Sequence, residues 1–419
     1  MLRKIRTSAS YPVARTIVEL KGAYQWIKSF NKKVKIHFEL NYSGQPIMLL
    51  ALYQKGCLRH DLIRLLRIAK AQNLYVVGVN TLELQEPEAL QGLVDCYIER
   101  PNFGRDFGSY KVGFLHCFKR HWVDSCPRLI MVNDSVFYAS RGLENFIKDL
   151  SVSQVEVLGA TENYEIEHHL GSFCISMAQS VLTSARFKAF WKNYRLTDTR
   201  PVVIRRGEMK LSRTLKRCVS SPLQFRALYD SSRYLSELKS NSSMLELIIR
   251  DSRTSDKVDW PAFNPTSVAE FFSNRFVVRK FNAQENITID ANASVEKMHE
   301  DLLIFEANDL ERYILRHVSE GAKLFDEIFR DVIASIAVEN FSAGSQIHQN
   351  AALLLEAGLP IIKLDGLYRG AFNHYDILRI CRKLKDSESI ELKALLFNRP
   401  YGGATLRGWQ LVAFYKGLI

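Results

Sequence analysis

Residues 46–81 read PIMLLALYQKGCLRHDLIRLLRIAKAQNLYVVGVNT, and this stretch indicates the fold class. Its apolar beginning, PIMLLALY, predicts a short buried strand. The middle places Leu62, Leu66 and Ala69 on one helical stripe, and the final β-branched run LYVVGVNT predicts a second strand. A strand–helix–strand unit is typical of parallel sheets, because the chain must cross over between two parallel strands.

The same alternation continues along the front half of the chain. Strands are expected at 95–102, 128–132, 155–161 and 172–177, and helices at 86–94, from Ser109 onward and at 142–150. Strands alternating with helices predict an α/β fold with a doubly wound, mostly parallel, Rossmann-like sheet. Ligands of such sheets bind in a crevice at the carboxyl ends of the strands.

The composition changes after about Ser220. Polar, serine-rich stretches such as YDSSRYLSELKSNSS separate the α/β part from helical patterns such as KLFDEIFRDVIASIAV and NAALLLEAG. We therefore expect a basic, amphipathic segment at 1–33, an α/β domain at 34–235, and a mainly helical region at 236–419 for contacts with an acceptor, a membrane or a partner.

The net charge of +12 restricts the class of partner rather than the fold. Short basic clusters fit a nucleotide diphosphate, an anionic membrane surface, nucleic acid or a plain solvated surface. No RNP signature, helix-turn-helix pattern or zinc finger is found, so no nucleic acid is expected as a partner. The seven cysteines form no CxxC pair. With no apolar run of membrane-spanning length and no secretory h-region at the basic start, we expect a cytoplasmic location.

A glycine-rich stretch, RPNFGRDFGS, follows one of the expected strands. Gly104 and Gly108 allow the backbone to approach a ligand, and the next helix start offers unpaired N–H groups to an anion. The guanidinium of Arg105 suits phosphate oxygens. The pattern favours a nucleotide or diphosphate site, and the alternative is a tight loop in which Asp106 caps the following helix.

A second polar stretch, VNDS, ends the expected strand at 128–132. The carboxylate of Asp134 could hold Mg²⁺ or Mn²⁺, which would neutralise the diphosphate of a leaving nucleotide. Asn133 and Ser135 would add neutral oxygens or hydrogen bonds. The alternative is an Asx turn that only ends the strand.

Two later segments offer candidates for acid–base chemistry. In GATENYEIEHHLGSF, His168 and His169 are adjacent in an extended segment and therefore point to opposite faces, so they would not share a metal. One of them could contact substrate, and a solvated acidic loop is the alternative. Glu208, in RRGEMKLSRTLKRC, stands near an expected helix start, where it could act as a general base or simply as a favourable first-turn acid.

Four motifs occur in the order seen in one family. NFGRDFGSYK, LIMVNDSVFYASRGLENFI, HHLGSFCIS with FKAFWKNY, and GEMKLSRTLKR resemble the rhamnan synthesis F family, bacterial glycosyltransferases that build surface polysaccharides, from about Val34 to Arg217. Later, AALLLEAGLPIIKLDGLYRG resembles the family's G-P-F-hydrophobic-K element, with Gly358, Pro360 and Lys363 matching. Isoleucine replaces the phenylalanine of this element, and the N-P-T that commonly precedes it lies far upstream.

The resemblance implies a GT-A-like fold and transfer of a deoxyhexose, with dTDP-rhamnose favoured as the nucleotide-sugar donor. It places these residues at the donor: Asn102, Gly104, Arg105, Asp106, Gly108, Asn133, Ser135 and His169. Asp134 takes the position of the metal-binding DxD of many GT-A enzymes, although NDS has one carboxylate instead of two. Glu208 resembles the acid that supplies the base in many inverting enzymes, but Met209 replaces the aspartate that usually follows.

The reaction implied is direct displacement, in which Glu208 deprotonates the acceptor hydroxyl and Arg105, with a metal on Asp134 where one is bound, stabilises the departing diphosphate. The acceptor would be a lipid-linked glycan or oligosaccharide of an O-antigen, capsule or rhamnan. The protein would then bind peripherally to the anionic inner face of the cytoplasmic membrane. The alternative is a non-catalytic glycan-binding or assembly subunit with the same fold.

Overall fold

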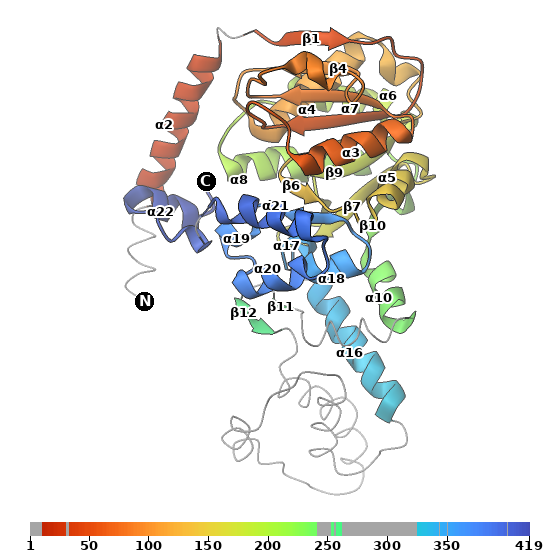
Figure 1. Ribbon diagram of the computed structural model, residues 1–419, viewed down its shortest axis with the longest axis vertical. Helices are drawn as coiled ribbons and strands as arrows, with labels where there is room; N and C mark the ends of the chain where they lie inside the picture. The colour runs from red at the N-terminus through yellow and green to blue at the C-terminus, as the bar shows by residue number, and fades with distance from the viewer. Residues whose placement is uncertain are drawn as a thin grey trace, which may run out of the picture. The chain divides into compact units, whose positions relative to one another are not determined.

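The computed structural model describes residues 11–30, 33–240, 253–254, 257–261, 325–342, 344–349, 351–399 and 401–419 (Figure 1). These residues form two compact units. One unit comprises 1–230 and 354–419, and the other comprises 231–353. Among the described residues, no helix combines the length and the apolar character that a membrane span requires.

A nine-stranded mixed sheet forms the centre of the first unit, in the order β1-β4-β3-β2-β5-β9-β7-β10, with β8 paired to β7. The strands are β1 (Lys35–Glu39), β2 (Ile47–Leu52), β3 (Tyr75–Asn80), β4 (Cys96–Glu99), β5 (Arg128–Asn133), β7 (Val157–Asn163), β8 (His169–Leu170), β9 (Cys174–Ala178) and β10 (Phe225–Tyr229). Strands β4, β3, β2 and β5 are parallel, and β7 and β10 are parallel to each other. Strands β1, β8 and β9 run antiparallel to their neighbours, so the expectation of a mostly parallel sheet was only partly right.

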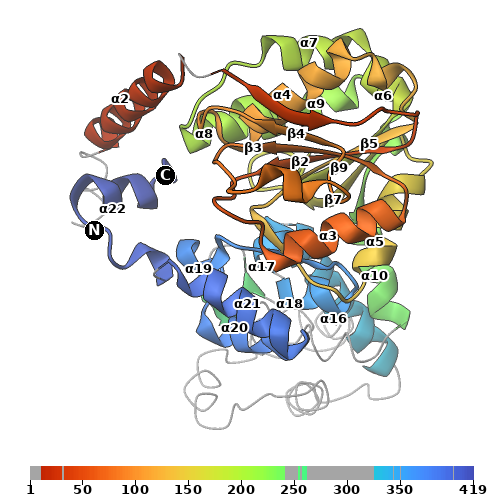
Figure 2. The same ribbon diagram turned by 45° about the horizontal axis from the view of Figure 1, so that its top comes forward.

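Helices cover both faces of this sheet (Figure 2). On one face lie α3 (His60–Ala71) and α5 (Leu143–Val152), and on the other lie α4 (Arg105–Lys119), α6 (Gln179–Thr183), α7 (Ala185–Asn193) and α9 (Lys210–Lys216). Because both faces are covered, every residue of β2, β3 and β5 is buried, and these strands are continuous apolar runs instead of alternating ones.

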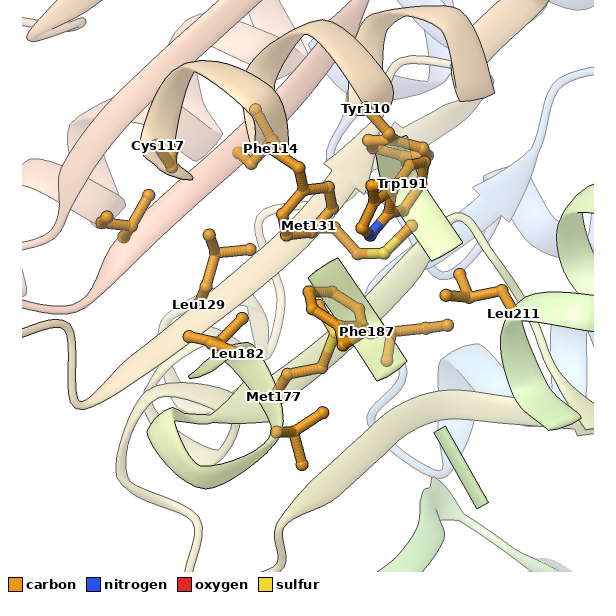
Figure 3. Close-up of a cluster of buried hydrophobic side chains, with 14 of the residues drawn as sticks. Tyr110, Phe114, Cys117, Leu129, Met131, Met177, Leu182, Phe187, Trp191 and Leu211 are labelled. Atoms are coloured by element: carbon orange, nitrogen blue, oxygen red, sulfur yellow. The ribbon is translucent and has the colours of Figure 1, made fainter. Parts of the chain in front are cut away.

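Aromatic and aliphatic side chains together fill the core between α4 and the sheet (Figure 3). Tyr110 and Phe114 of α4 face Met131 of β5 and Trp191 of α7. The rings of Phe114 and Trp191 stack with centroids 4.6 Å apart. Large aromatic residues bury the most apolar area per side chain, so this cluster fixes α4 on the sheet.

Three local expectations were wrong. Residues 86–94 form only a short 3₁₀ helix, η1 (Pro87–Leu90). Helix α4 begins at Arg105 instead of Ser109, because Gly104 takes a left-handed conformation at the N-cap. Glu208 does not stand at a helix start. Helix α8 (Arg200–Val203), with Pro201 in its first turn, continues through the π-helix η3 (Ile204–Met209) into α9, so Glu208 lies inside a helical run.

The C-terminal residues 354–419 return to the sheet domain. Strand β13 (Ile361–Lys363) pairs antiparallel with β6 (Val136–Tyr138), which directly follows β5. The remaining elements are mainly helical: α18 (Ala351–Glu356), α19 (Gly366–Arg369), α20 (His374–Cys381), α21 (Asp386–Phe397), η7 (Tyr401–Gly403) and α22 (Gly408–Tyr415). Helix α2 (Tyr11–Phe30) packs on α22, with Ala14 and Val18 against Ala413.

The second unit contains the predicted helix at 323–338, seen as α16 (Phe325–Ser342). It packs on α10 (Ser231–Ser240), where the rings of Tyr234 and Phe341 stack with centroids 4.1 Å apart. This unit also includes α17 (Gln346–Gln349) and the short pair β11 (Arg253–Thr254) and β12 (Lys257–Pro261). The upstream N-P-T of the sequence, which spans Asn264 to Thr266, lies outside the described residues.

Candidate functional site

Asp134 lies where the strand order of the sheet reverses, at the carboxyl ends of β2 and β5. Its backbone N–H donates to the carbonyl of Ala51 at 3.1 Å, and its Oδ2 accepts from the backbone N–H of Tyr53 at 2.6 Å and from Nε2 of Gln54. The residue is 6% exposed. Asp134 therefore has a fixed geometry that both strands define.

The electrostatics of Asp134 are unusual for a carboxylate. Burial raises its pKa to about 6, while the hydrogen bond from Tyr53 and the charge of Arg59 act in the opposite direction. Arg59 also donates from Nη1 to the Asp134 carbonyl at 2.9 Å and forms an ion pair with Asp61 at 2.9 Å. The Arg59 guanidinium thus fixes the conformation of the turn after β5. Its charge also stabilises the ionised form of the Asp134 carboxylate.

Asn133 links this turn to the first turn of α4. Its Nδ2 donates to Oδ2 of Asp106 at 2.8 Å, and its Oδ1 accepts from the Ser135 hydroxyl at 2.8 Å. The two polar stretches singled out in the sequence, RPNFGRDFGS and VNDS, are therefore joined by a direct hydrogen bond. Asp106 does not cap α4 at the N-cap position, since Gly104 occupies it without a side-chain cap.

Lys363 enters the same cluster from the C-terminal part of the chain. Its Nζ donates to Oγ of Ser135 at 3.0 Å and lies 5.3 Å from the ring centroid of Phe173. Burial raises the pKa of Asp106, whereas the charges of Lys363 and Arg105 lower it. The ammonium group is thus an electrostatic neighbour of the Asp106 carboxylate.

Glu208 adjoins this cluster from the π-helix η3. Its Oε1 accepts from the Ser172 hydroxyl at 2.9 Å, and its Oε2 lies 3.8 Å from Nε2 of His169. The Glu208 side chain is 28% exposed, and its charge contributes to the raised pKa of Asp106. Single π-turns often occur at functional sites, and Gly207 lets this one pack closely on Phe107, which lies 2.9 Å from where a Cβ would stand.

His169 is held in one orientation. It is buried, and its Nδ1 donates to the Glu167 carbonyl at 2.7 Å, so the other ring nitrogen faces Glu208. His168 points elsewhere: its Nε2 lies 3.7 Å from Oε2 of Glu162, and its carbonyl accepts from Nζ of Lys216 at 2.8 Å. The expected divergence of the adjacent histidines is confirmed.

Contacts with Asp198 and Arg100 hold the glycine-rich loop in its conformation. The Gly104 N–H donates to Oδ1 of Asp198 at 2.7 Å, and Nε of Arg105 donates to the Asp198 carbonyl at 2.8 Å. A Cβ at Gly108 would lie 2.7 Å from the buried guanidinium of Arg100. The close packing of Arg100 therefore explains why position 108 needs a glycine, whether or not a ligand binds there.

Asn102 is exposed, and within the described part of the chain its side chain makes no hydrogen bond.

Arginine side chains extend the site beyond the predicted residues. Arg369 pairs with Asp365 at 2.6 Å, whereas the side chain of Arg200 makes no hydrogen bond or ion pair to any residue that the structure describes. Burial lowers the pKa of Arg200, and Arg369 lowers it further while Asp365 and Glu208 raise it. The Arg200 guanidinium thus lies in the electrostatic neighbourhood of Glu208 without a bonded anion.

A divalent cation would find few protein ligands at Asp134. Within the described residues, Asp134 belongs to no group of three His, Cys, Asp or Glu ligand atoms that lie within 4.8 Å of one another. One of its oxygens already accepts two hydrogen bonds. Asp134 can offer a single ligand atom, so a metal here would take most of its ligands from a bound diphosphate or water.

The structure therefore brings most predicted residues into two adjoining groups. Asp106, Asn133, Asp134 and Ser135 form one group, and His169 and Glu208 form the other. The sequence prediction did not include Ser172, Arg200 and Lys363 among the site residues. A signal existed only for Lys363, which matches the late family element.

Comparison with known proteins supports the family indicated by the motifs. Residues 74–249 match the family model of rhamnan synthesis protein F. The chain is 29% identical over 175 residues to the uncharacterized protein y4gN of Sinorhizobium fredii, which covers 40% of this chain and 45% of the relative. It is 33% identical over 119 residues to the virulence protein VirA of Vibrio anguillarum, which covers 28% of this chain and 38% of the relative. The chain thus spans less than half the length of these relatives.

Proposed function

Since residues 74–249 match the family model of rhamnan synthesis protein F, we propose that the protein is a glycosyltransferase with a doubly wound, GT-A-like domain. It would transfer rhamnose or a related deoxyhexose from a nucleotide-sugar donor, with dTDP-rhamnose favoured, to a cell-surface polysaccharide. The observation that carries this proposal is a chain of hydrogen bonds that runs from Lys363 through Ser135 and Asn133 to Asp106 at the strand ends. It joins a cation from the C-terminal part of the chain to the two polar stretches of the sheet domain.

The donor diphosphate would bind on the cationic side of this site. Lys363, Arg105 and Arg200 offer three positive groups, and Arg200 has no bonded anion among the described residues. Guanidinium forks and an ammonium group stabilise the charge that develops on the leaving diphosphate. Asp106 and Asn133 would then orient the sugar or ribose hydroxyls, because both carry hydrogen-bonding groups at the strand ends.

Glu208 would act as the general base. In a direct displacement, the acceptor hydroxyl oxygen bonds to the anomeric carbon, the bond from that carbon to the diphosphate oxygen breaks, and the hydroxyl proton passes to the Glu208 carboxylate. The hydrogen bond from Ser172 at 2.9 Å would orient one oxygen and leave the other for the acceptor. His169 would stabilise the ionised carboxylate when its ring is protonated.

Magnesium or manganese is compatible with this mechanism but is not assigned a step. When bound, such an ion would neutralise diphosphate charge, with Asp134 as a single protein ligand. Lys363 and the arginines supply positive charge from the protein itself, so we expect donor binding to depend more on these side chains than on the metal.

The acceptor would be a lipid-linked glycan, which places the protein at the inner face of the cytoplasmic membrane. Helix α2 supports this part of the proposal, since Val13, Leu20, Tyr24 and Ile27 form an exposed apolar stripe on one helical face. Lys21 and Lys28 border that stripe. Such a helix can lie in the surface of an anionic bilayer.

A non-catalytic glycan-binding or assembly role is the second candidate. The observations that favour it are the single carboxylate of the NDS turn and the buried Met209 at the position after Glu208. A protein of this kind would bind a glycan or nucleotide sugar without turnover.

The decisive experiment measures the melting temperature and sugar transfer of the purified chain against a panel of nucleotide sugars, with and without Mg²⁺ or Mn²⁺. A donor at 100 times its dissociation constant should add about 2.7 kcal/mol of stability. A shift with one donor together with transfer or donor hydrolysis supports the enzyme. A shift without turnover supports the binding role. No shift with any nucleotide sugar contradicts the enzyme and leaves binding of a glycan as the function that remains.

A further inference from the structure

Three ligating side chains of different chemistry meet at the outer edge of the sheet. Nε2 of His116 lies 2.6 Å from Oε2 of Glu39, and Sγ of Cys96 lies 3.8 Å from the same nitrogen and 4.0 Å from the same oxygen. Within the part of the chain that the structure describes, this is the one group of three His, Cys, Asp or Glu ligand atoms that all lie within 4.8 Å of one another.

This group is separate from the proposed donor site. His116 lies ten residues after Asp106 in α4, which corresponds to roughly 15 Å along the helix axis. Cys96 begins β4 at its amino end, whereas the donor site lies at the carboxyl ends of the strands. The two sites are therefore at opposite ends of the same helix and sheet.

The ligand types and distances suit a zinc ion. Zinc takes thiolate, imidazole and carboxylate ligands at about 2.0–2.3 Å, so tetrahedral ligand atoms lie roughly 3.3–3.8 Å apart. Both distances from Cys96 Sγ are already close to that range. The contact between His116 and Glu39 would have to open by less than about 1 Å, which side-chain rotation can supply.

The surrounding structure holds the three side chains in place. Glu39 and Cys96 are partners in the antiparallel pairing of β1 and β4. The ring of His116 packs edge-on to Trp122 with centroids 5.2 Å apart, and Arg120 pairs with the other Glu39 oxygen at 2.8 Å. Cys96 is fully buried, whereas Glu39 is 19% exposed at its side chain and leaves a route for an ion from solvent.

We propose that Glu39, Cys96 and His116 form a zinc site, with water as the fourth ligand. Binding would release the thiol proton of Cys96 to solvent and move the Nε2 proton that His116 donates to Glu39 through solvent to Nδ1 of the same ring. The direct contact between His116 and Glu39 would then be replaced by two metal–ligand bonds. The ion would then connect the edge strand β1, the strand β4 and the helix α4 in one cross-link. Because metal binding to a folded site adds to folding free energy, zinc should stabilise the sheet domain.

The test uses Co²⁺ as a spectroscopic probe of the full chain, kept reduced. A sulfur-to-cobalt charge-transfer band at one equivalent, abolished by Zn²⁺ competition, is expected. Cys96→Ser should abolish the band, whereas Cys57→Ser, which changes an exposed cysteine, should leave it unchanged. His116→Gln should weaken Co²⁺ affinity at least tenfold and serves as a second variant if Cys96→Ser fails to fold.

Zn²⁺ should also raise the melting temperature of the native chain and of Cys57→Ser but not of His116→Gln. Absence of a charge-transfer band in the native chain would overturn the proposal. So would a band that survives Cys96→Ser, or one that is lost in Cys57→Ser. None of these measurements depends on glycosyltransferase activity, so the zinc site and the proposed function can fail separately.

Discussion

Lys363 Nζ donates to the Ser135 hydroxyl at 3.0 Å, although 228 residues separate the two positions in the chain. The contact exists because β13, which ends at Lys363, pairs with β6 directly after the NDS turn. The C-terminal part of the chain therefore completes the candidate site and does more than follow it.

Lys363→Met should weaken donor binding if the ammonium group contacts the diphosphate. A lost charge-assisted hydrogen bond is worth roughly 1.5–3 kcal/mol, so the dissociation constant for the donor should rise about tenfold to a hundredfold. Isothermal titration with the donor found in the panel measures this. Lys416→Met, at an exposed lysine, is the control, and equal affinities of the two variants would contradict the assignment.

Glu208→Gln should lower turnover while leaving donor affinity nearly unchanged. A general base contributes typically 10²–10⁴-fold, and glutamine keeps the shape of the side chain but cannot take the proton. Initial rates at saturating acceptor give kcat, and the donor KM is measured in parallel. Glu165→Gln alters an exposed glutamate in the nearby acidic segment and should leave both constants unchanged. Normal kcat in Glu208→Gln would remove Glu208 from the mechanism.

Much of the sheet domain is readable from local patterns. The strands at β2, β3, β4, β5, β7 and β9 and the helices α3 and α5 lie where the apolar runs and helical stripes predicted them. Strand direction was less predictable, because β9 is nearly as buried as the parallel strands but runs antiparallel to both of its neighbours, β5 and β7. The residue pattern of a buried strand is the same in either direction.

The candidate site was predictable only where its residues are local. Asn133, Asp134 and Ser135 follow one expected strand, and Asp106 lies in the glycine-rich stretch that follows another, so their positions at the strand ends follow from the pattern. Glu208 was placed at a helix start because the sequence alone does not indicate that the helix already begins at Arg200. Ser172 and Arg200 carry no local signal, since their roles depend on contacts across the fold.

The raised pKa of Asp134 predicts a pH dependence of stability. Its pKa is about 6 in the folded protein against an ordinary value of 3.8, so between these values the native state binds more protons than the unfolded state. The contribution of Asp134 to the unfolding free energy therefore falls as the pH rises from about 4 to about 6, and it is constant above that. The full difference of about 2 pKa units corresponds to roughly 3 kcal/mol.

Asp134→Asn should remove this dependence. The unfolding free energy is measured for both proteins by urea denaturation from pH 4 to pH 7. As the pH rises, the value for the native chain should fall relative to that for the variant by up to about 3 kcal/mol. Other titrating groups cancel in the difference. Asp149→Asn, at an exposed aspartate, is the control. A pH-independent difference for Asp134→Asn would contradict the raised pKa.

Gly108→Ala tests whether this glycine serves packing. Its new Cβ would stand 2.7 Å from the guanidinium of Arg100, which is buried and bonded to the Ser109 hydroxyl at 2.9 Å. Overpacking of this kind costs typically 1–3 kcal/mol in unfolding free energy. Gly22→Ala is the matched control, because nothing lies within 4 Å of its Cβ position in α2, and there alanine should stabilise by up to about 1 kcal/mol. Equal effects of both substitutions would show that Arg100 yields readily.

Helix α2 predicts how the chain would bind an anionic bilayer. Leu20 and Ile27 are exposed on its apolar stripe, and inserting an exposed side chain of this size into the bilayer interface gains about 1.5–3 kcal/mol. The double substitution Leu20→Ser, Ile27→Ser should therefore reduce the bound fraction at least tenfold in flotation with liposomes that contain anionic lipid. The native chain should bind more weakly at high salt, because Lys21 and Lys28 add an electrostatic contribution.

The control for α2 changes polarity on other faces of the same helix. Ala23→Ser with Gln25→Ser alters two exposed positions outside the stripe and should leave flotation unchanged. If both double variants bind as the native chain does, another basic surface mediates the membrane contact. If the native chain fails to float with anionic liposomes even at low salt, the proposed membrane location is wrong, while the donor-binding and turnover predictions for Lys363 and Glu208 still stand on their own measurements.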